Sequence, residues 1–503
     1  MPSYQRLVLA IKAARQLGLE QAGLYMQYQL ALRSGWLRRK TPAKEPNNEN
    51  EPGGFNLSSG LLSVPNRDQL AKLVGDQASV LLAEANDLNL GKVRLFGGPP
   101  QALNLVVPLP LQHWTSITFG QDIIGVEDIK FIWEPARFTW IYPLVRAYIL
   151  SGDESYAETF WQEFEAFTDI NLPNMGPNWV SAQEVALRLI SFTFAYQVFC
   201  SSETCTEARV SRLSRSIADH AARIPATLVY ARAQKNNHLL SEAAGLITAG
   251  IVLPAHRKAR SWIDLGKRWF NYALETQISS SGTYVQHSTN YHRMMLQLAL
   301  WVASLGELIT QENAERLATA TQWLLGLVDP DTGRVPNLGH NDGSYFQPLS
   351  SCSYADYRPV VQSAAAVFLG GKPFPAGPWD ELGLWLGLRN DFSQAAVEDI
   401  SSEAILVKEF PGSHITLHDQ TNSSWACLRA ARFNSRPAHA DQLHLDFWWR
   451  EHNVALDAGT YLYNAHPPWD NSLIHSGNHN TVKIDGNDQM TKAGRFLWLD
   501  WAQ

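Results

Sequence analysis

Long apolar segments with helical spacing dominate the chain from about residue 66 to residue 390. Their apolar residues recur every three or four positions, and Gly, Pro and Asn separate the segments. Many helices of similar length with short connections predict paired antiparallel helices that curve into a toroid or solenoid. The expected helices cover residues 137–150, 154–168, 181–200, 207–231, 238–253, 261–278, 291–307, 313–328 and 357–370.

The pattern changes after about residue 395 to short segments rich in β-branched and aromatic residues, which predict antiparallel sheet. The expected strands cover residues 403–409, 413–418, 424–433, 443–449, 453–457 and 480–485. The last run, 496–503, is strand-like and has no closing element, so we expect an incomplete β domain. A chain of 503 residues is too long for one ordinary core. We predict a helical hairpin and linker at 1–60, an (α/α) toroid at 61–395 and a β domain at 396–503.

The first helix-like segment does not resemble a signal peptide, because Lys12 and Arg15 interrupt its apolar residues. No apolar run is long enough to span a bilayer. The four cysteines are scattered and leave the redox compartment undecided. As the sequence stands, it predicts a cytoplasmic protein.

Composition argues against nucleic acid as a partner and is compatible with carbohydrate. The net charge of -7 argues against general nucleic-acid binding. The 18 Trp, 16 Tyr and 20 Phe could stack on sugar rings, although aromatic residues more often pack in cores. The sequence does not indicate an oligomeric state.

A polar cluster stands at the start of the helix expected at 238–253. Asn236, Asn237, His238 and Glu242 place two amides, an imidazole and a carboxylate there. Helix N-termini carry unpaired N–H groups and the positive end of the dipole, so the cluster could hold an anion. The alternative is an ordinary cap, with His238 and Glu242 paired on the helix surface.

A second cluster, residues 284–293, precedes another expected helix and contains His287, Tyr291 and Arg293. A tyrosine near a cation can exchange protons, and its hydroxyl can act as base and then as acid. The alternative is that Tyr291 is a half-buried hydrogen-bonding residue of the core.

Three loops of the helical region add candidate ligand contacts. In a toroid the loops at one end line the central cleft, where Trp can stack on sugars and charged groups can bind their substituents. Turn chemistry is the alternative for the third loop. The candidates are Trp133, Glu134 and Arg137 in the first loop, Asn178, Trp179 and Glu184 in the second, and His340 in the third.

Eight of the fifteen histidines lie after residue 395. Among them, His439 and His479 could combine with Asp457 as a set of two imidazoles and one carboxylate for a divalent metal, with a position left open for water. A hydrogen-bonded His/Asp network in the sheet is the alternative.

Taken together, several segments resemble the heparinase II/III family of polysaccharide lyases, which is related to alginate and oligoalginate lyases. They follow the family's order and cover roughly residues 120 to 503. The segments are NNHLLSEAAGL at 236–246, Tyr291-His292 after Gln286-His287-Ser288, PNLGHNDGS at 336–344, HADQLHLDFWW at 439–449, LDAGTYLYN at 456–464 and HNTVKIDGNDQM at 479–490.

The resemblance implies an incomplete (α/α) toroid followed by an antiparallel β-sandwich, with a long cleft between them. It also implies β-elimination of a uronate-containing glycan. In that reaction Asn237 and His238 match the positions that neutralise the sugar carboxylate, and Tyr291 matches the proton-transferring tyrosine. By the same resemblance, His439, Asp457 and His479 match metal positions, and periplasmic or secreted locations stay open.

The sequence departs from the family at one catalytic position. Pro437 stands where the β domain usually supplies a histidine. Either His439 takes that role, or it is a metal ligand and His238 is the only imidazole base.

We expect an acidic polysaccharide or oligosaccharide as partner, one divalent metal, zinc or calcium, and no organic cofactor. The sequence does not identify the glycan. Two other functions stay open: a catalytically silent glycan-binding or biosynthetic accessory protein, and a glycoside hydrolase that uses Glu134 and Glu184.

Overall fold

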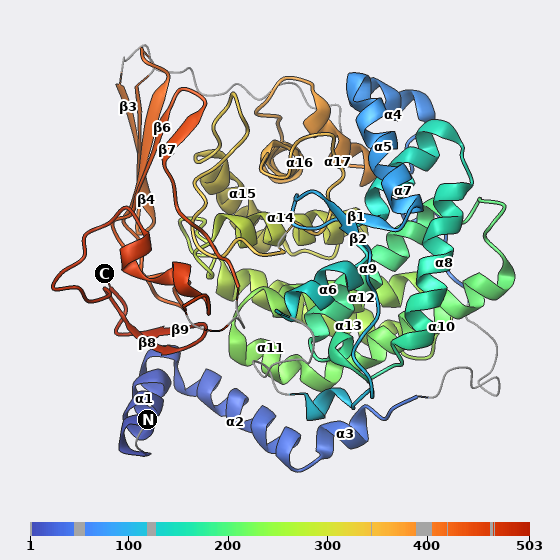
Figure 1. Cartoon of the computed structure of the whole chain (residues 1–503), viewed down its shortest axis with the longest axis horizontal. Coiled ribbons are helices and arrows are strands. Elements are labelled where there is room, and N and C mark those ends of the chain that lie inside the picture. Colours follow the sequence, from blue (N-terminus) through green and yellow to red (C-terminus); the bar gives the residue numbers. More distant parts are fainter. Residues whose placement is uncertain are drawn as a thin grey trace.

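A computed structural model describes residues 3–44, 56–117, 127–343, 345–388, 405–419, 421–462, 466 and 468–502. Helices form most of the molecule, and the longer strands stand together along one side (Figure 1). The expected boundary between toroid and β domain at 395/396 and most of the expected linker lie outside the described residues. Among the described residues, no helix combines the length and apolar character needed to cross a membrane.

The helices occur close to the positions that their periodicity predicts. The prediction of one helix over 207–231 is wrong, because Pro225 lies in a short 3-10 turn, Ile224–Thr227, between α10 and α11. The helices are α1 (Ser3–Leu17), α2 (Leu19–Arg33), α3 (Trp36–Lys40), α4 (Arg67–Val74), α5 (Ala78–Asn89), α6 (Lys130–Ala136), α7 (Ile141–Ser151), α8 (Ser155–Ile170), α9 (Ala182–Phe199), α10 (Glu207–Arg223), α11 (Leu228–Gln234), α12 (Asn237–Val252), α13 (Ala259–Gln277), α14 (Thr289–Ser304), α15 (Gln311–Leu325), α16 (Arg358–Phe368) and α17 (Glu381–Trp385).

The helical region has inner and outer helices, as a toroid requires. Every residue of α9 is buried, and so are nearly all residues of α12 and α14. By contrast, α10 and α13 each have an apolar side and a polar side. α12 packs against α9, α13 and α14. Because Gly250 and Gly266 lack Cβ atoms, α12 and α13 can approach closely: a Cβ at Gly266 would lie 2.7 Å from the carbonyl oxygen of Ala243.

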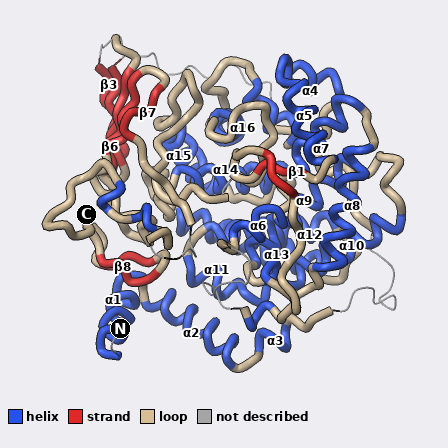
Figure 2. The backbone as a smooth tube through the Cα atoms, in the orientation of Figure 1, coloured by secondary structure: helices blue, strands red, loops and turns tan. Residues whose placement is uncertain are grey.

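The C-terminal region contains a five-stranded antiparallel sheet in the order β3-β4-β5-β6-β7 and a separate pair, β8-β9 (Figure 2). The described residues include no second large sheet facing the first. A further short pair, β1 (Lys92–Arg94) and β2 (Pro100–Ala102), lies earlier in the chain. The C-terminal strands are β3 (Ile405–Phe410), β4 (His414–Asp419), β5 (Ser424–Arg429), β6 (Leu445–Trp449), β7 (His452–Ala455), β8 (Thr491–Gly494) and β9 (Leu497–Leu499).

The expected strand at 480–485 is absent from the structure. Val482 and Ile484 are 61% and 71% exposed, so their β-branched side chains have no sheet to pack against. The polar neighbours of these residues support a loop instead. Asn480 N–H donates to Nδ1 of His444, and Oγ1 of Thr481 donates to the carbonyl of Gln442.

Direct contacts hold the sheet against the helical region. Nε1 of Trp323 in α15 donates to Oγ of Ser413 at 2.9 Å, and Nε1 of Trp425 in β5 donates to Oδ2 of Asp329 at 3.1 Å. The N-terminal helices α1 and α2 run along one edge, below β8, β9 and α11 (Figure 1). Lys12 forms an ion pair with Asp500 at 2.8 Å, so α1 also contacts the C-terminal region.

Candidate active site

The inner helices α9, α12 and α14 begin at the same end of the toroid. Nδ2 of Asn237 donates to Oε1 of Gln183 at the start of α9, at 2.7 Å. The same nitrogen lies 3.6 Å from Sδ of Met294 in α14. Successive helices in such an array alternate in direction, which brings alternate N-termini together. Residues 183, 237 and 291, distant in sequence, therefore belong to one region.

The first three N–H groups of α12 each have a hydrogen-bond acceptor. Asn237 N–H donates to Oε1 of Gln286 at 2.9 Å, and His238 N–H donates to Oδ1 of Asn236 at 3.1 Å. Leu239 N–H donates to the carbonyl of Asn236. These three groups therefore form the ordinary cap of the alternative interpretation, with Asn236 as the N-cap residue. An anion at this position must be bound by side chains.

His238 is the more accessible of the two side chains at the start of α12. Its side chain is 21% exposed, whereas Asn237 is 3% exposed. Burial lowers the pKa of His238 to about 4, with Glu184 opposing this shift and Arg137 adding to it. The imidazole is therefore neutral near pH 7. Nδ1 of His238 lies 3.9 Å from Oε1 of Glu242, so the two residues come together as expected, although Glu242 is almost fully buried rather than on the helix surface.

Tyr291, in the first turn of α14, keeps its proton at neutral pH. Its hydroxyl donates to Oδ1 of Asp342 at 3.4 Å. Burial raises the pKa of Tyr291 well above its ordinary value, and the negative charges of Asp342 and Glu184 add to this effect. Arg137 opposes the shift but does not reverse it. The phenol is therefore placed to give a proton rather than to take one.

Asp342 also belongs to this region, although its sequence surroundings did not identify it as a site residue. Burial raises the pKa of its carboxyl to about 7, against Lys130 and Arg137, while Glu134 adds to the shift. Its only sequence signal was the polar loop 336–344, for which turn chemistry was a sufficient explanation. Gln183 and Gln286 were not identified as members of the site either, although Gln286 lies within one of the segments that resemble the family.

Arg137 organises the acidic side chains around Tyr291 and His238. Its guanidinium donates to both carboxylate oxygens of Glu184 at 2.6 and 2.9 Å and to Glu134 at 2.7 Å. It also donates to the carbonyl of Gly343. Burial alone would lower the pKa of Arg137, but the two carboxylates outweigh that effect and raise it. One cation thus joins α6, α9 and the loop that carries Asp342.

Several candidates for ligand contact lie in the core instead. Asn178, Trp179 and Arg293 are each 1% exposed. Nε1 of Trp179 donates to the carbonyl of Asn171, and Nδ2 of Asn178 donates to the Asn171 side chain. Arg293 lies against the rings of three tyrosines, 345, 354 and 357. These residues stabilise the walls of the region. Trp133 remains half-buried, with its Nε1 donating to the carbonyl of Pro177.

The predicted metal set comes together in the β domain. His439, Asp457 and His479 each offer one ligand atom, and these atoms lie within 4.8 Å of one another. His439 and Asp457 are completely buried. Nδ1 of His479 lies 3.2 Å from Oδ2 of Asp457, as in the alternative of a His/Asp network, whereas neither ring nitrogen of His439 has a hydrogen-bond partner among the described residues. The buried His439 nitrogens without a hydrogen-bond partner, beside a buried carboxylate and a second imidazole, fit a cation in this cluster.

Two further histidines lie where the toroid meets the β domain. His340 approaches Oγ1 of Thr460 through Nδ1 at 3.0 Å, and its ring packs edge-on against His439. The carbonyl of His287 accepts a hydrogen bond from Arg429 at 3.1 Å, and its ring packs against Phe433. Both residues are therefore interface residues as well as candidate ligand contacts.

Comparison with known proteins agrees with this architecture. Residues 115–344 match the family model "Heparinase II/III N-terminus", and residues 406–503 match "Heparinase II/III-like, C-terminal". Heparin-sulfate lyase of Bacteroides stercoris is 26% identical over 425 residues, covering 76% of this chain and 59% of that protein. Heparin-sulfate lyase of Bacteroides thetaiotaomicron is 28% identical over 159 residues, or 31% of this chain and 22% of that protein.

A solved structure shares the fold. The crystal structure of heparinase III superposes with a TM-score of 0.55 at 15% identity, covering 95% of this chain and 70% of that one. The helical region followed by an antiparallel sheet is thus confirmed as the heparinase arrangement. The chain spans about three fifths of the length of the Bacteroides stercoris lyase, at 59%. The two family models together cover most of the sequence, and the chain belongs to the heparinase II/III family.

Proposed function

We propose that this protein is a polysaccharide lyase that cleaves a uronic-acid-containing glycan by β-elimination. The observation that carries the proposal is that a neutral imidazole, His238, and a protonated phenol, Tyr291, both lie at the same end of the inner helices. Elimination needs one group that accepts a proton and one that donates a proton. These two side chains have the required protonation states at neutral pH.

In the proposed reaction, His238 takes the proton from C5 of the uronate. The electron pair of that C–H bond forms the C4–C5 double bond, and the C4–O4 bond breaks. Tyr291 gives its proton to the departing O4. Asn237 donates a hydrogen bond to the sugar carboxylate, exchanging its weak contact with the sulfur of Met294, so that negative charge can spread into the carboxylate.

The complete burial of His439 supports the role of metal ligand for this residue. His238 is then the base. At the position of the family's second imidazole this chain has Pro437, which cannot accept a proton. That same departure favours the second candidate, a glycan-binding protein without turnover. A hydrolase is disfavoured, because Glu134 and Glu184 are both bound to Arg137 rather than facing a substrate across a cleft.

Mass spectrometry of the products separates these functions. Purified protein is incubated with heparan sulfate, alginate and other uronic-acid glycans. The heparin-sulfate lyases among its relatives make a glycosaminoglycan the first substrate to test. We expect fragments that carry an unsaturated uronate and have not gained water. Fragments that have gained one water would instead establish hydrolysis, and binding without fragments would establish the silent function.

Asp342 should give the lyase a pH dependence near neutrality. When Tyr291 donates its proton, it becomes a phenolate, and an ionised carboxylate beside it opposes that change. Because the pKa of Asp342 is raised to about 7, the carboxyl is mostly neutral below that pH and ionised above it. We expect kcat to fall as the pH rises through about 7. The Asp342→Asn variant, which stays neutral, should lose this dependence.

The imidazole of His238 does not titrate in the same interval, because its pKa is lowered to about 4. Steady-state rates of both proteins, measured across that interval, check the assignment. A neutral-pH inflection that persists unchanged in Asp342→Asn would contradict it.

We infer that His439, Asp457 and His479 hold a divalent cation. Two imidazoles and one carboxylate suit zinc better than calcium, which prefers oxygen ligands. The cation would hold the β-domain loops together beside His340. We assign no step of the elimination to it.

Zinc binding should appear as thermal stabilisation. Protein dialysed against a chelator should melt at a lower temperature, and zinc added back should restore about 2.7 kcal/mol of stability at a hundredfold excess over its Kd. Calcium should have a smaller effect, and the His479→Asn variant should not respond to zinc. Equal melting curves for wild-type protein with and without zinc would contradict the inference.

A further inference from the structure

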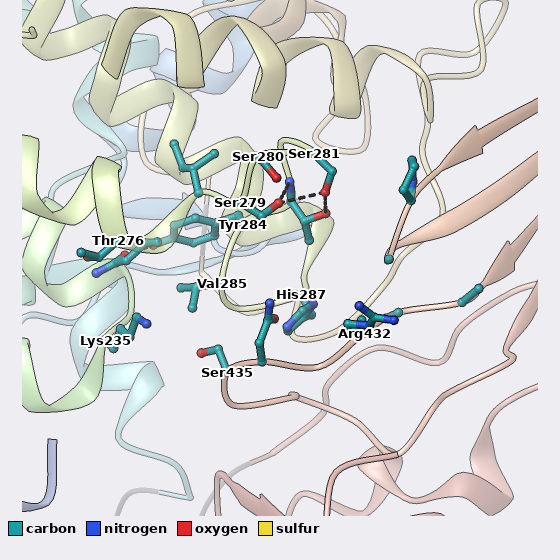
Figure 3. A pocket seen from close by; sticks show the side chains of 18 of the residues that line it. Lys235, Thr276, Ser279, Ser280, Ser281, Tyr284, Val285, His287, Arg432 and Ser435 are labelled. Atoms are coloured by element: carbon teal, nitrogen blue, oxygen red, sulfur yellow. Dashed lines mark hydrogen bonds between the residues drawn. The ribbon is translucent and has the colours of Figure 1, made fainter. Parts of the chain in front are cut away.

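A cavity of about 810 Å³ lies between the helical region and the β domain, beside the candidate active site (Figure 3). One wall is formed by residues 276–287, which connect α13 to α14. The other is formed by residues 411–412, 430–432, 434–435 and 442–443, most of which flank β5 and β6. Gln286, between two lining residues, accepts the hydrogen bond from Asn237 N–H. The cavity therefore adjoins the start of α12.

The lining of this cavity is cationic. It contains Lys235 and Arg432 but no Asp or Glu. Within the described part of the chain, neither charged group has a hydrogen-bond or ion-pair partner. Lys235 directly follows α11, and its backbone is in the left-handed region, at a φ of 48°, which is uncommon for a residue with a side chain. The two cations lie on opposite sides of His287 in Figure 3.

Two side-chain nitrogen atoms that lack partners also belong to residues lining the cavity. Gln277 and His287 are 2% and 8% exposed, and Nε2 of each has no hydrogen-bond partner among the described residues. Unsatisfied polar atoms at such depth are costly unless a ligand or water reaches them. Ser279, Ser281 and Thr283 add hydroxyl groups, with Oγ of Ser279 and Ser281 2.9 Å apart.

We propose that this cavity binds the anionic group, a carboxylate or a sulfate, of a sugar next to the one that is cleaved. Cations, hydroxyls and amides without a competing acid match the oxygens of such a group. The position of the bound sugar relative to the cleaved linkage rests on the proposed function. The binding of an acidic glycan in the cavity does not.

Binding to labelled oligosaccharides tests the proposal without turnover. Two glycans of equal length are compared, a sulfated heparan oligosaccharide and its desulfated form, with protein that carries Tyr291→Phe. Lys235→Met and Arg432→Gln are each added to this background. Each removes a charge-assisted hydrogen bond, so we expect affinity to fall about tenfold in each case.

Matched controls come from α4, on the other side of the molecule (Figure 1). Lys72→Met and Arg67→Gln remove exposed charges there and should leave affinity unchanged. A loss confined to the sulfated glycan identifies sulfate as the bound group, and a loss with both glycans identifies the carboxylate. Affinities of Lys235→Met and Arg432→Gln equal to those of the controls would overturn the proposal.

The same glycans distinguish this proposal from the lyase proposal. Product formation is measured with wild-type protein alone. If no unsaturated product forms but both cavity variants lose affinity, the lyase proposal fails and the cavity proposal stands. If product forms and the cavity variants bind normally, only the cavity proposal fails. Arg432 lies on an exposed loop, so its substitution leaves the fold intact.

Discussion

Tyr291→Phe should reduce the rate of unsaturated product formation by about 10²–10⁴-fold, the usual contribution of a positioned general acid. The substitution removes only the hydroxyl that donates to Asp342. That hydrogen bond is long, at 3.4 Å, and the ring keeps its packing, so stability should change little. Ultraviolet absorbance of the unsaturated uronate measures the rate.

Tyr25→Phe provides the control, because Tyr25 lies on α2 and is 45% exposed. Its rate should equal that of the wild-type protein. A Tyr291→Phe variant that retained wild-type kcat would remove Tyr291 from the chemistry. If the variant lost activity together with its fold, circular dichroism would reveal that cause.

Arg137→Met should lower the free energy of unfolding by about 3–5 kcal/mol. The substitution leaves Glu134 and Glu184 without their shared cation, and these residues are only 6% and 2% exposed. Burial of an unpaired carboxylate is costly, so the carboxyls must take up protons or draw in water. The loop that carries Gly343 and Asp342 also loses an anchor.

Urea unfolding followed by circular dichroism measures this loss. The matched control is Arg260→Met, which removes an exposed i,i+4 ion pair with Asp264 at 3.0 Å. Such pairs contribute about 0.3–0.5 kcal/mol. Equal unfolding midpoints for the two variants would show that Arg137 is not the organising cation of the region.

The helices were predictable because the spacing of their apolar residues depends directly on burial, either of one face or of the whole helix. The prediction of a strand at 480–485 was wrong because Val482 and Ile484 alternate with polar residues as in a strand, but both side chains are exposed. The extent of the sheet depends on contacts between distant segments, such as those of Trp323 and Trp425 with the opposite domain. Local patterns do not encode these contacts.

The candidate site was only partly predictable. The family motifs identified Asn237, His238 and Tyr291 as residues of one site. They could not show which polar residues are accessible and which are buried. Arg293 and Arg137 have the same chemistry in sequence, yet one is enclosed by tyrosines and the other joins two acids. Asp342 required the approach of a loop to α14, which is a tertiary property. Protonation states followed only from these surroundings.

A crystal structure of the Tyr291→Phe protein with a bound acidic oligosaccharide would show whether the uronate lies between the starts of α12 and α14. We expect a uronate carboxyl within hydrogen-bonding distance of the Asn237 side chain, with C5 facing His238 and O4 facing residue 291. A glycan bound productively elsewhere, without contact to the starts of α12 and α14, would contradict this expectation.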